Sequence, residues 1–268
     1  MSSVHSPDEL LSVRRALATL ELLAGAPGGR GVSELARELG VHKSSASRLL
    51  ATLRSGGLVD VDLATGRFGL GAGFLRLAAR AVERLDISQL ALPFLRDLAA
   101  QSGETAYLSV RRGLHRVAVQ EMESANPVRM VAGIGHAYPL YRGAPSKILL
   151  AALPDEEVAK VIASMPRDAA SRRLKAAMRA EIALARDDGY AISLEENIPS
   201  AAAIAVPVYG HLGTVVAALG IAGVTPRWGR QRMLAFLPAL RQSADEIAGL
   251  IGYPLMDGVA SSPRRKEG

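Results

Sequence analysis

Apolar residues near the start of the chain recur at helical spacing. The positions that would share one core-facing side of a first helix are Val13, Ala16, Leu17, Leu20 and Leu23. Ser12 is expected to cap this helix, because its hydroxyl can accept from a free backbone N–H of the first turn. Gly25 ends it, and a loop at residues 27–29 follows. A second, shorter helix is expected to begin at the cap residue Ser33.

A third helix is predicted from about His42 to Ser55, after a tight turn at Gly40. Its core stripe consists of Ala46, Leu49, Leu50 and Leu53. Residues 41–59 contain three Lys or Arg residues and no carboxylate. This composition suits a helix that enters the major groove of DNA, where the outer face approaches phosphates and the first turn meets base edges.

On an isolated helix, such charges would more often mark a solvent-exposed face than a DNA contact. The residues that follow this helix favour the DNA-binding interpretation. Residues 58–62 alternate like a strand, Thr65-Gly66 forms a turn, and residues 67–70 return. Helix, turn, basic helix and hairpin in this order predict a winged helix-turn-helix, with Arg67 near the tip of the wing. The predicted DNA contacts are Ser33, His42, Lys43, Ser44, Ser45, Ser47, Arg48 and Arg67.

Three glycines, Gly69, Gly71 and Gly73, separate this hairpin from a further helical stretch at residues 74–85. Their spacing differs from the G-x-G-x-x-G of dinucleotide-binding folds, and helical segments stand where the next strand of a βαβ unit belongs. We therefore expect the glycines to form a hinge between the hairpin and a connecting helix.

Beyond residue 88, helices alternate with β-rich runs, of which the clearest are residues 105–110, 114–120, 201–208 and 214–222. The last two runs are nearly continuous apolar stretches, so they are either buried on both faces or placed between a core and an apolar cavity. Their many small residues leave volume that packed helices or a ligand would fill. A long C-terminal helix is expected to pack on the sheet through Trp228, Met233, Phe236, Leu237, Leu240, Ala244, Ile247 and Ile251.

Composition narrows the functional classes. The 268 residues include no cysteine, which excludes disulfides, iron–sulfur clusters and Cys-type zinc sites. The net charge of +6 is compatible with a nucleic-acid partner. No stretch approaches the roughly 20 apolar residues that cross a bilayer. The polar first eight residues do not resemble a signal peptide. We expect a cytoplasmic protein with no membrane partner.

No catalytic residue is assigned. The five histidines form no H-E-x-x-H pattern or close pairing with carboxylates, so no catalytic metal site is predicted. A G-x-S-x-G motif is absent, and Ser146-Lys147 lacks the S-x-x-K spacing of serine acyl-transfer enzymes. The carboxylate pairs Glu195-Glu196 and Asp187-Asp188 are expected to be solvated. We therefore expect no cofactor and no enzymatic activity.

Motifs in both halves of the chain carry a resemblance to a known family. The N-terminal motifs are Ser12-Val13-x-Arg15-Ala16-Leu17, Ser33-x-Leu35-Ala36-x-x-Leu39-Gly40 and Lys43-Ser44-Ser45-x-x-Arg48-Leu49-Leu50-x-Thr52-Leu53. The C-terminal motifs are Gly135-x-x-x-Pro139-Leu140, Lys147-x-Leu149-Leu150-Ala151 and Ile204-Ala205-Val206-Pro207-Val208. In this order, from about Ser12 to about Ile251, they resemble the IclR family of bacterial transcriptional regulators.

The resemblance implies a mixed α+β protein with a winged helix-turn-helix DNA-binding domain, a linker helix, and a GAF/PAS-like α/β effector-binding domain. We place these parts at residues 10–71, 72–87 and 88–253, followed by a flexible tail at 254–268. The implied function is a repressor or activator of transcription that binds operator DNA and responds to a small metabolite. The implied assembly is a homodimer or a dimer of dimers, and one winged helix alone would gain little specificity from one half-site.

The resemblance also implies an effector pocket made of Met130, Ala144, Pro145, Ser193, Ala203, Ala205, Gly220 and Ala222. The chain departs from the family here, because it has Tyr141-Arg142-Gly143-Ala144-Pro145-Ser146-Lys147 where His-x-Thr/Ser-Ala/Gly-x-Gly-Lys is common. Pro145 suits a first helical turn but removes an N–H that could hold an anion.

Gly220 and Ala222 stand where sensors of small oxyacids in the family often have hydroxyls. A pocket with so few donors favours an aromatic or largely apolar acid over a short dicarboxylate. The candidate polar anchors for such a ligand are Arg129, Arg142 and Tyr107.

A second hypothesis belongs to another class. The chain could be a small-molecule enzyme or carrier whose degenerate helix-turn-helix serves protein contacts. The basic third helix, free of carboxylates, favours the regulator. The sequence is compatible with a repressor or an activator, and with a dimer or a tetramer.

Overall fold

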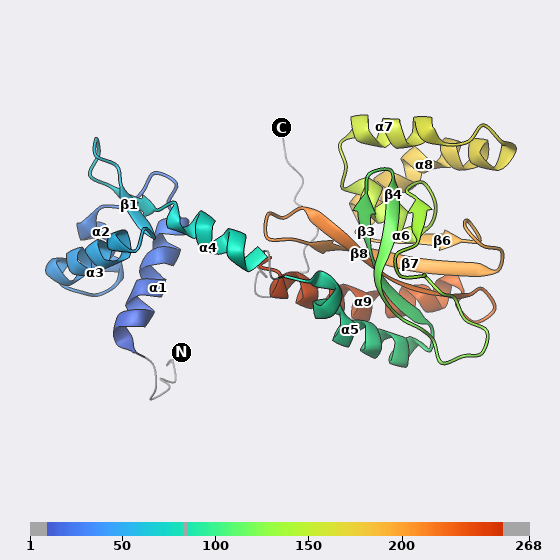
Figure 1. Cartoon of the computed structure of the whole chain (residues 1–268), viewed down its shortest axis with the longest axis horizontal. Helices are drawn as coiled ribbons and strands as arrows, with labels where there is room; N and C mark the ends of the chain where they lie inside the picture. The colour runs from blue at the N-terminus through green and yellow to red at the C-terminus, as the bar shows by residue number, and fades with distance from the viewer. Residues whose placement is uncertain (1–9, 83–84, 254–268) are drawn as a thin grey trace. The chain divides into compact units, whose positions relative to one another are not determined.

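The computed structural model describes residues 10–82 and 85–253. The chain divides by its internal contacts into two units, residues 1–85 and 86–268, whose helices and strands are labelled in Figure 1. The polar N-terminal residues 1–8 and the predicted tail at 254–268 lie outside the described residues. Within the described ranges, no helix has the length and apolar character needed to cross a membrane.

The first unit is a winged helix-turn-helix, as the sequence predicts. Its elements are α1 (Leu11–Ala24), α2 (Val32–Glu38), α3 (Lys43–Ser55), the antiparallel strands β1 (Val59–Val61) and β2 (Phe68–Leu70), and α4 (Gly73–Val82). Its core is formed by Leu23, Leu35, Leu50, Leu53 and Val59. Gly40, at φ +63°, makes the sharp turn between α2 and α3 that a non-glycine side chain would strain.

The helix starts differ from the sequence expectation. Helix α1 begins one residue before Ser12, and Ser12 makes no capping bond. Helix α2 begins at Val32, because the carboxylate of Glu34 reaches back and accepts from the Gly31 N–H at 3.2 Å, which leaves Ser33 inside the first turn. The third helix follows its prediction, with the His42 ring accepting from the Ser44 N–H at 3.3 Å as its cap.

Helix α1 also buries a narrower face than predicted. Leu23 is buried, and Ala16 and Leu20 are half-buried, whereas Val13 and Leu17 are exposed. In the N-terminal half of α1, Ala16 packs against the core of this unit, whereas Val13 and Leu17 stay exposed.

The glycines after the wing do not form the expected hinge, because two of them hydrogen-bond to the segment between α3 and β1. The Gly71 N–H donates to the Leu58 carbonyl and the Gly73 N–H to the Gly57 carbonyl, both at 2.9 Å. A Cβ atom at Gly71 would collide with the Gly57 carbonyl oxygen, and one at Gly73 would lie 2.5 Å from it. These two positions are glycine because the start of α4 runs directly against the backbone that links α3 to β1.

The second unit is built on a six-stranded antiparallel sheet with the order β5-β4-β3-β8-β7-β6. The strands are β3 (Thr105–Arg112), β4 (His115–Met122), β5 (Ala137–Pro139), β6 (Ala191–Leu194), β7 (Ala201–Tyr209) and β8 (Val215–Val224). Strands β3 and β8 pair at the middle of the sheet although they are distant in sequence, with Tyr107 opposite Gly220.

Helices cover both faces of this sheet (Figure 1). One layer contains α5 (Ile87–Ser102) and α9 (Arg230–Leu250), and the other contains α6 (Ala144–Ala151), α7 (Asp155–Ser164) and α8 (Ala169–Asp188). Along β7, Ile204 and Val206 pack on the α5/α9 side, and Ala203 and Ala205 pack on the α6 side. The long apolar runs are thus buried on both faces.

Trp228 is buried, as expected, but it precedes the C-terminal helix. Helix α9 is capped by Gly229 and starts at Arg230, which leaves Trp228 in the turn after β8. Its ring lies 5.4 Å from that of Phe236, measured between centroids. Ile251 likewise follows the helix end.

The glycine contact generates a stability prediction. We expect Gly71→Ala to destabilise the first unit by about 1–3 kcal/mol, because the added methyl group must displace the Gly57 carbonyl. The matched control is Gly69→Ala, where no atom lies within 4 Å of the new methyl group. Urea unfolding of the full chain, followed by circular dichroism, measures both. Equal stability of the two variants would show that the close approach is not required.

Candidate functional site

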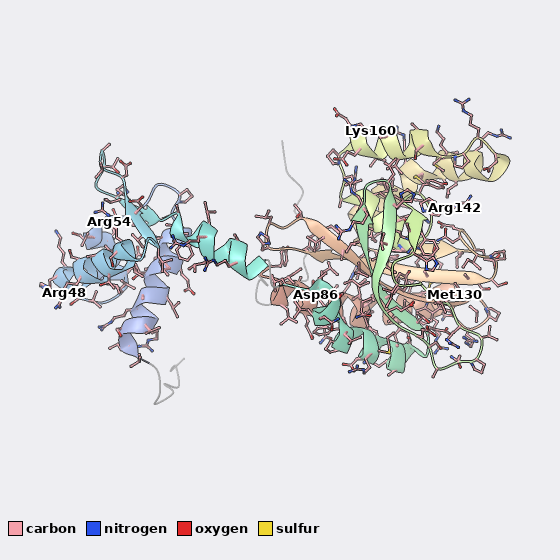
Figure 2. The ribbon with its side chains drawn as sticks, in the orientation of Figure 1. Arg48, Arg54, Asp86, Met130, Arg142 and Lys160 are labelled. Atoms are coloured by element: carbon pink, nitrogen blue, oxygen red, sulfur yellow. The ribbon has the colours of Figure 1, made fainter. Side chains whose placement is uncertain are left out.

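The exposed side of α3 gathers most of the residues predicted to contact DNA. His42, Lys43, Ser44, Ser47 and Arg48 are exposed and Ser45 is half-buried, while the opposite face enters the core. Figure 2 labels Arg48 and Arg54 on this helix. Within the described part of the chain, neither Lys43 nor Arg48 forms an ion pair. Both cations are therefore available to an anionic partner.

The charge of the whole unit has the same sign. Residues 10–82 contain ten Lys and Arg residues against five Asp and Glu residues, and the net charge of the chain is +6. Residues 10–82 therefore carry a net charge of +5, and the whole first unit, residues 1–85, carries +3, half of the excess positive charge on less than a third of the sequence. Such an excess attracts a polyanion and steers its approach.

Arg67 has structural partners in addition to its predicted role. Its guanidinium donates to the carbonyls of Gly28 and Gly29 at 3.1 and 3.0 Å and to the Glu34 carboxylate at 3.0 Å. The Gly31 N–H and the Arg67 guanidinium hold the pKa of Glu34 below its usual value. Arg67 thus ties β2 to the start of α2, and it lies at the base of the hairpin turn. Ser33 is exposed on the first turn of α2.

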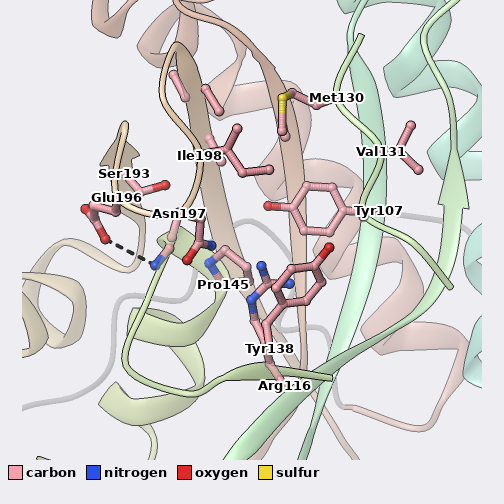
Figure 3. A pocket seen from close by; sticks show the side chains of 17 residues that line it. Tyr107, Arg116, Met130, Val131, Tyr138, Pro145, Ser193, Glu196, Asn197 and Ile198 are labelled. Carbon is pink, nitrogen blue, oxygen red and sulfur yellow. Dashed lines mark hydrogen bonds between the residues drawn. The ribbon is translucent and has the colours of Figure 1, made fainter. Parts of the chain in front are cut away.

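In the second unit, a small hollow with a cavity volume of about 60 Å³, partly open to solvent, lies on the α6 side of the sheet. Six of the eight residues predicted for the effector pocket line it, namely Met130, Ala144, Pro145, Ser193, Ala203 and Ala222. Figure 3 shows Met130 and Pro145 around this hollow, with Tyr107 between them.

Tyr107 explains why the other two predicted residues, Ala205 and Gly220, do not line the hollow. A Cβ atom at Gly220 would lie 3.0 Å from the Tyr107 hydroxyl, so the absence of a side chain there makes room for the tyrosine. Ala205 pairs with Gly220 and is fully buried. Burial raises the pKa of Tyr107 to about 12, so its hydroxyl stays protonated and can donate a hydrogen bond at neutral pH.

Arg116 is a lining residue that the sequence analysis missed. It projects from β4, is only 6% exposed, and lies over the Tyr138 ring with its central carbon 4.4 Å from the ring centroid. Its Nε and Nη1 atoms are buried without a hydrogen-bond partner among the described residues. Burial lowers the pKa of Arg116 from its ordinary value. Strand alternation could have indicated it, because Arg116 shares a face with the buried Ala118.

The other candidate anchors from the sequence lie elsewhere. Arg129 pairs with Glu123 at 2.6 Å and does not line the hollow, and Arg142 does not line it either. Of the three candidates, Tyr107 alone is a lining residue.

Glu196 was expected to be solvated, yet its side chain is only 17% exposed and pairs with Lys147. It also accepts from the Gly143 N–H at 3.1 Å, shown as a dashed line in Figure 3. Lys147 is 7% exposed, donates to the Ile192 carbonyl at 2.9 Å and pairs with Glu181 at 3.0 Å. The pairing arises because the loop after β6 folds over the first turn of α6. Asp187 and Asp188 are exposed, as expected.

No group of three or more His, Asp or Glu side chains in the described ranges is placed to hold a metal ion. The chemistry available here is recognition of a ligand. The hollow offers a guanidinium, two phenols, a serine hydroxyl, an amide and the Glu196 carboxylate within walls that include alanine, methionine and isoleucine.

Comparison with known proteins gives a consistent result. The family described as "Bacterial transcriptional regulator IclR C-terminal" matches residues 79–249, and the "IclR helix-turn-helix domain" matches residues 12–63. The HTH-type transcriptional repressor AllR of Escherichia coli K12 is 29% identical over 244 residues, which cover 90% of each chain. The regulator XynR of the same strain is 28% identical, over 91% of this chain and 98% of its own.

A solved structure agrees with these matches. The repressor BlcR of Agrobacterium tumefaciens superposes with a TM-score of 0.74 at 27% identity, over 92% of this chain and all of its own.

The buried charges beside α6 generate a prediction. Lys147→Met leaves Glu196 and Glu181 without their shared cation, and we expect a loss of roughly 3 kcal/mol in the free energy of unfolding. The control is Lys160→Met on the exposed face of α7, where a change within about 0.5 kcal/mol is expected. Urea unfolding at neutral pH compares the two variants. Similar stabilities would mean that the Lys147 pairs contribute little.

Proposed function

The chain belongs to the IclR family of bacterial transcriptional regulators, and from this premise we propose that α3 contacts operator DNA and that the hollow beside α6 binds the effector. The protein is a DNA-binding transcriptional regulator with an effector-binding C-terminal domain. The matched relatives are regulators, and they give no support to the alternative of an enzyme or carrier. We place the protein in the cytoplasm, where its DNA target resides.

The observation that carries the DNA proposal is the exposed face of α3. Its cations have no carboxylate neighbours on the helix, and its small serines allow the helix to approach the floor of a groove. Lys43 and Arg48 supply the charge, and His42, Ser44, Ser45 and Ser47 flank them at the amino end. We assign DNA binding to residues 10–71, with Ser33 and Arg67 as peripheral contacts, and the linker helix to residues 72–87.

Effector binding is assigned to residues 88–253. The lining is dominated by alanine and other apolar side chains, which supports an aromatic or largely apolar acid as the ligand. To change operator binding, the ligand must bind one state of the protein more tightly than another, because equal affinity shifts no equilibrium.

Assembly as a homodimer or a dimer of dimers is proposed on two grounds. A single winged helix reads too few base pairs for a specific operator, and a dimer doubles the site. In addition, Leu10, which precedes α1, and Val13 and Leu17 in its first half are exposed, and together they offer an apolar surface that a second copy would cover.

A gel-shift experiment on the fragment upstream of the gene tests the DNA proposal. We expect wild-type binding to weaken steeply between low and moderate salt, because lysine and arginine contacts release counterions from DNA. Arg48→Ala should lose about 1–3 kcal/mol of binding free energy with the fold intact. Arg179→Ala, an exposed arginine on α8, is the control. An unchanged footprint for Arg48→Ala would remove this residue from the interface.

Calorimetry tests the proposed effector class. We expect aromatic monocarboxylic acids to bind the full chain more tightly than glyoxylate, because the alanine-rich wall gains from burying an apolar body. Ala222→Leu, which fills part of the hollow, should weaken the binding of aromatic acids and leave operator binding unchanged. Tight binding of glyoxylate alone would contradict the apolar ligand.

A further inference from the structure

Among the described residues, Arg116 is a buried cation without a counter-ion, and burying such a charge is energetically costly. A charge removed from water costs several kcal/mol unless it is paired or hydrogen-bonded. The Tyr138 ring offers the guanidinium a partial compensation through its face, at 4.4 Å. Two of the nitrogen atoms, Nε and Nη1, remain without an acceptor among the described residues. An anion in the hollow would supply both an acceptor and a counter-charge for this guanidinium.

The carboxylate nearest in the lining does not fill this role. Glu196 lines the hollow, but its two carboxylate oxygens already accept hydrogen bonds from Lys147 and from the Gly143 N–H. Lys147 is in turn shared between Glu196 and Glu181. The two buried cations beside the α6 layer therefore differ, since Lys147 is paired with carboxylates and Arg116 has no carboxylate partner in the described part of the chain.

The start of α6 gives an anion little to bind. The Gly143 N–H is already taken by Glu196, and Pro145 has no N–H. This end of the helix therefore lacks two of the donors that would otherwise favour an anion there. Arg116, whose Nη2 lies 3.9 Å from the position of a Cβ at Gly143, is the strongest donor at the hollow.

We propose that Arg116 binds the carboxylate of a monoanionic ligand, with the Tyr107 hydroxyl and the Asn197 amide as neutral donors at its sides. This inference rests on the proposed effector-binding function of the hollow. The planar guanidinium can meet a carboxylate with two parallel N–H···O bonds. In Figure 3, Arg116, Tyr107 and Asn197 surround the same space, and Met130 and Ile198 border its apolar side.

The remaining walls set the charge of the ligand at one. Away from Arg116 the lining is mostly apolar, and its polar groups, such as the Ser193 hydroxyl, are neutral or acidic, so a second carboxylate would have no counter-charge among the lining residues. Glu196 would also repel it. A neutral amide of the same shape would offer Arg116 one carbonyl acceptor but no counter-charge. The site therefore selects monoanions over both neutral and doubly charged analogues.

The test compares matched acids and amides on the full-length protein. The probes are benzoate, phenylacetate and 4-hydroxybenzoate, their primary amides, and the dianion phthalate, each measured by thermal shift and calorimetry. The variants are Arg116→Gln, Arg116→Lys and the control Arg112→Gln, an exposed arginine on β3.

For wild type and Arg112→Gln, we expect at least one monocarboxylate to bind about 10- to 100-fold more tightly than its amide, the range of a charge-assisted hydrogen bond. Phthalate should bind more weakly than that acid. Arg116→Gln should remove the preference for acid over amide, and Arg116→Lys should retain part of it.

A purely structural role of Arg116 predicts a different pattern. In that case Arg116→Gln lowers the unfolding temperature of the ligand-free protein and leaves the preference for acid over amide unchanged. Our proposal predicts that ligand-free Arg116→Gln unfolds at the wild-type temperature or above, because an unpaired buried cation is removed.

The proposal is overturned if no acid in the panel binds better than its amide, or if the preference survives in Arg116→Gln. A gel shift with the same preparations separates this failure from that of the proposed function. If the protein binds its operator but shows no preference for acids over amides, the proposed role of Arg116 is refuted and the proposed DNA-binding function is not. Failure of the wild type to bind its operator at low salt would refute the proposed DNA contacts themselves.

Discussion

The burial of one antiparallel sheet between two helical layers is the constraint on which the second unit depends. Because side chains alternate along a strand, β7 and β8 must satisfy two different neighbours at once. Large residues such as Ile204 and Leu219 face α5 and α9, while Ala203, Ala205 and Ala218 face the α6 layer. The side with small residues is also the side where the hollow forms. One strand pair therefore supplies both the main core and the floor of the binding site.

In both units, some of the cationic side chains are paired with carboxylates and others are not. Beside α6, Lys147 is held by two carboxylates and a carbonyl, which fixes the loop after β6 on the helix. Among the described residues, Arg116 is held by the face of the Tyr138 ring and by no carboxylate. In the first unit, Arg67 is bound by Glu34 and two carbonyls, and Arg48 on α3 has no ion pair in the described ranges. In each unit, one cation stabilises the fold and another is free for a partner.

Much of this architecture was predictable from the sequence, because helical and strand periodicities follow directly from burial. The winged helix-turn-helix, four of the six strands of the sheet and α9 were anticipated in this way, whereas the short edge strands β5 and β6 were not. Helix starts were not, since Glu34 caps α2 from inside the helix in place of Ser33. Trp228 was placed in a helix by its spacing, although Gly229 starts α9 after it. Arg116 and Glu196 were missed because pairing across the fold, or its absence, is not visible in local sequence.

The contact of Gly71 and Gly73 with Gly57 has a mechanical consequence. A loop at this point would let α4 pivot freely, and a twist of that helix would dissipate before it reached the rest of the first unit. Two backbone hydrogen bonds and the lack of side chains instead join the start of α4 to the end of α3. A rotation of α4 is then transmitted to α3, the helix proposed to contact DNA.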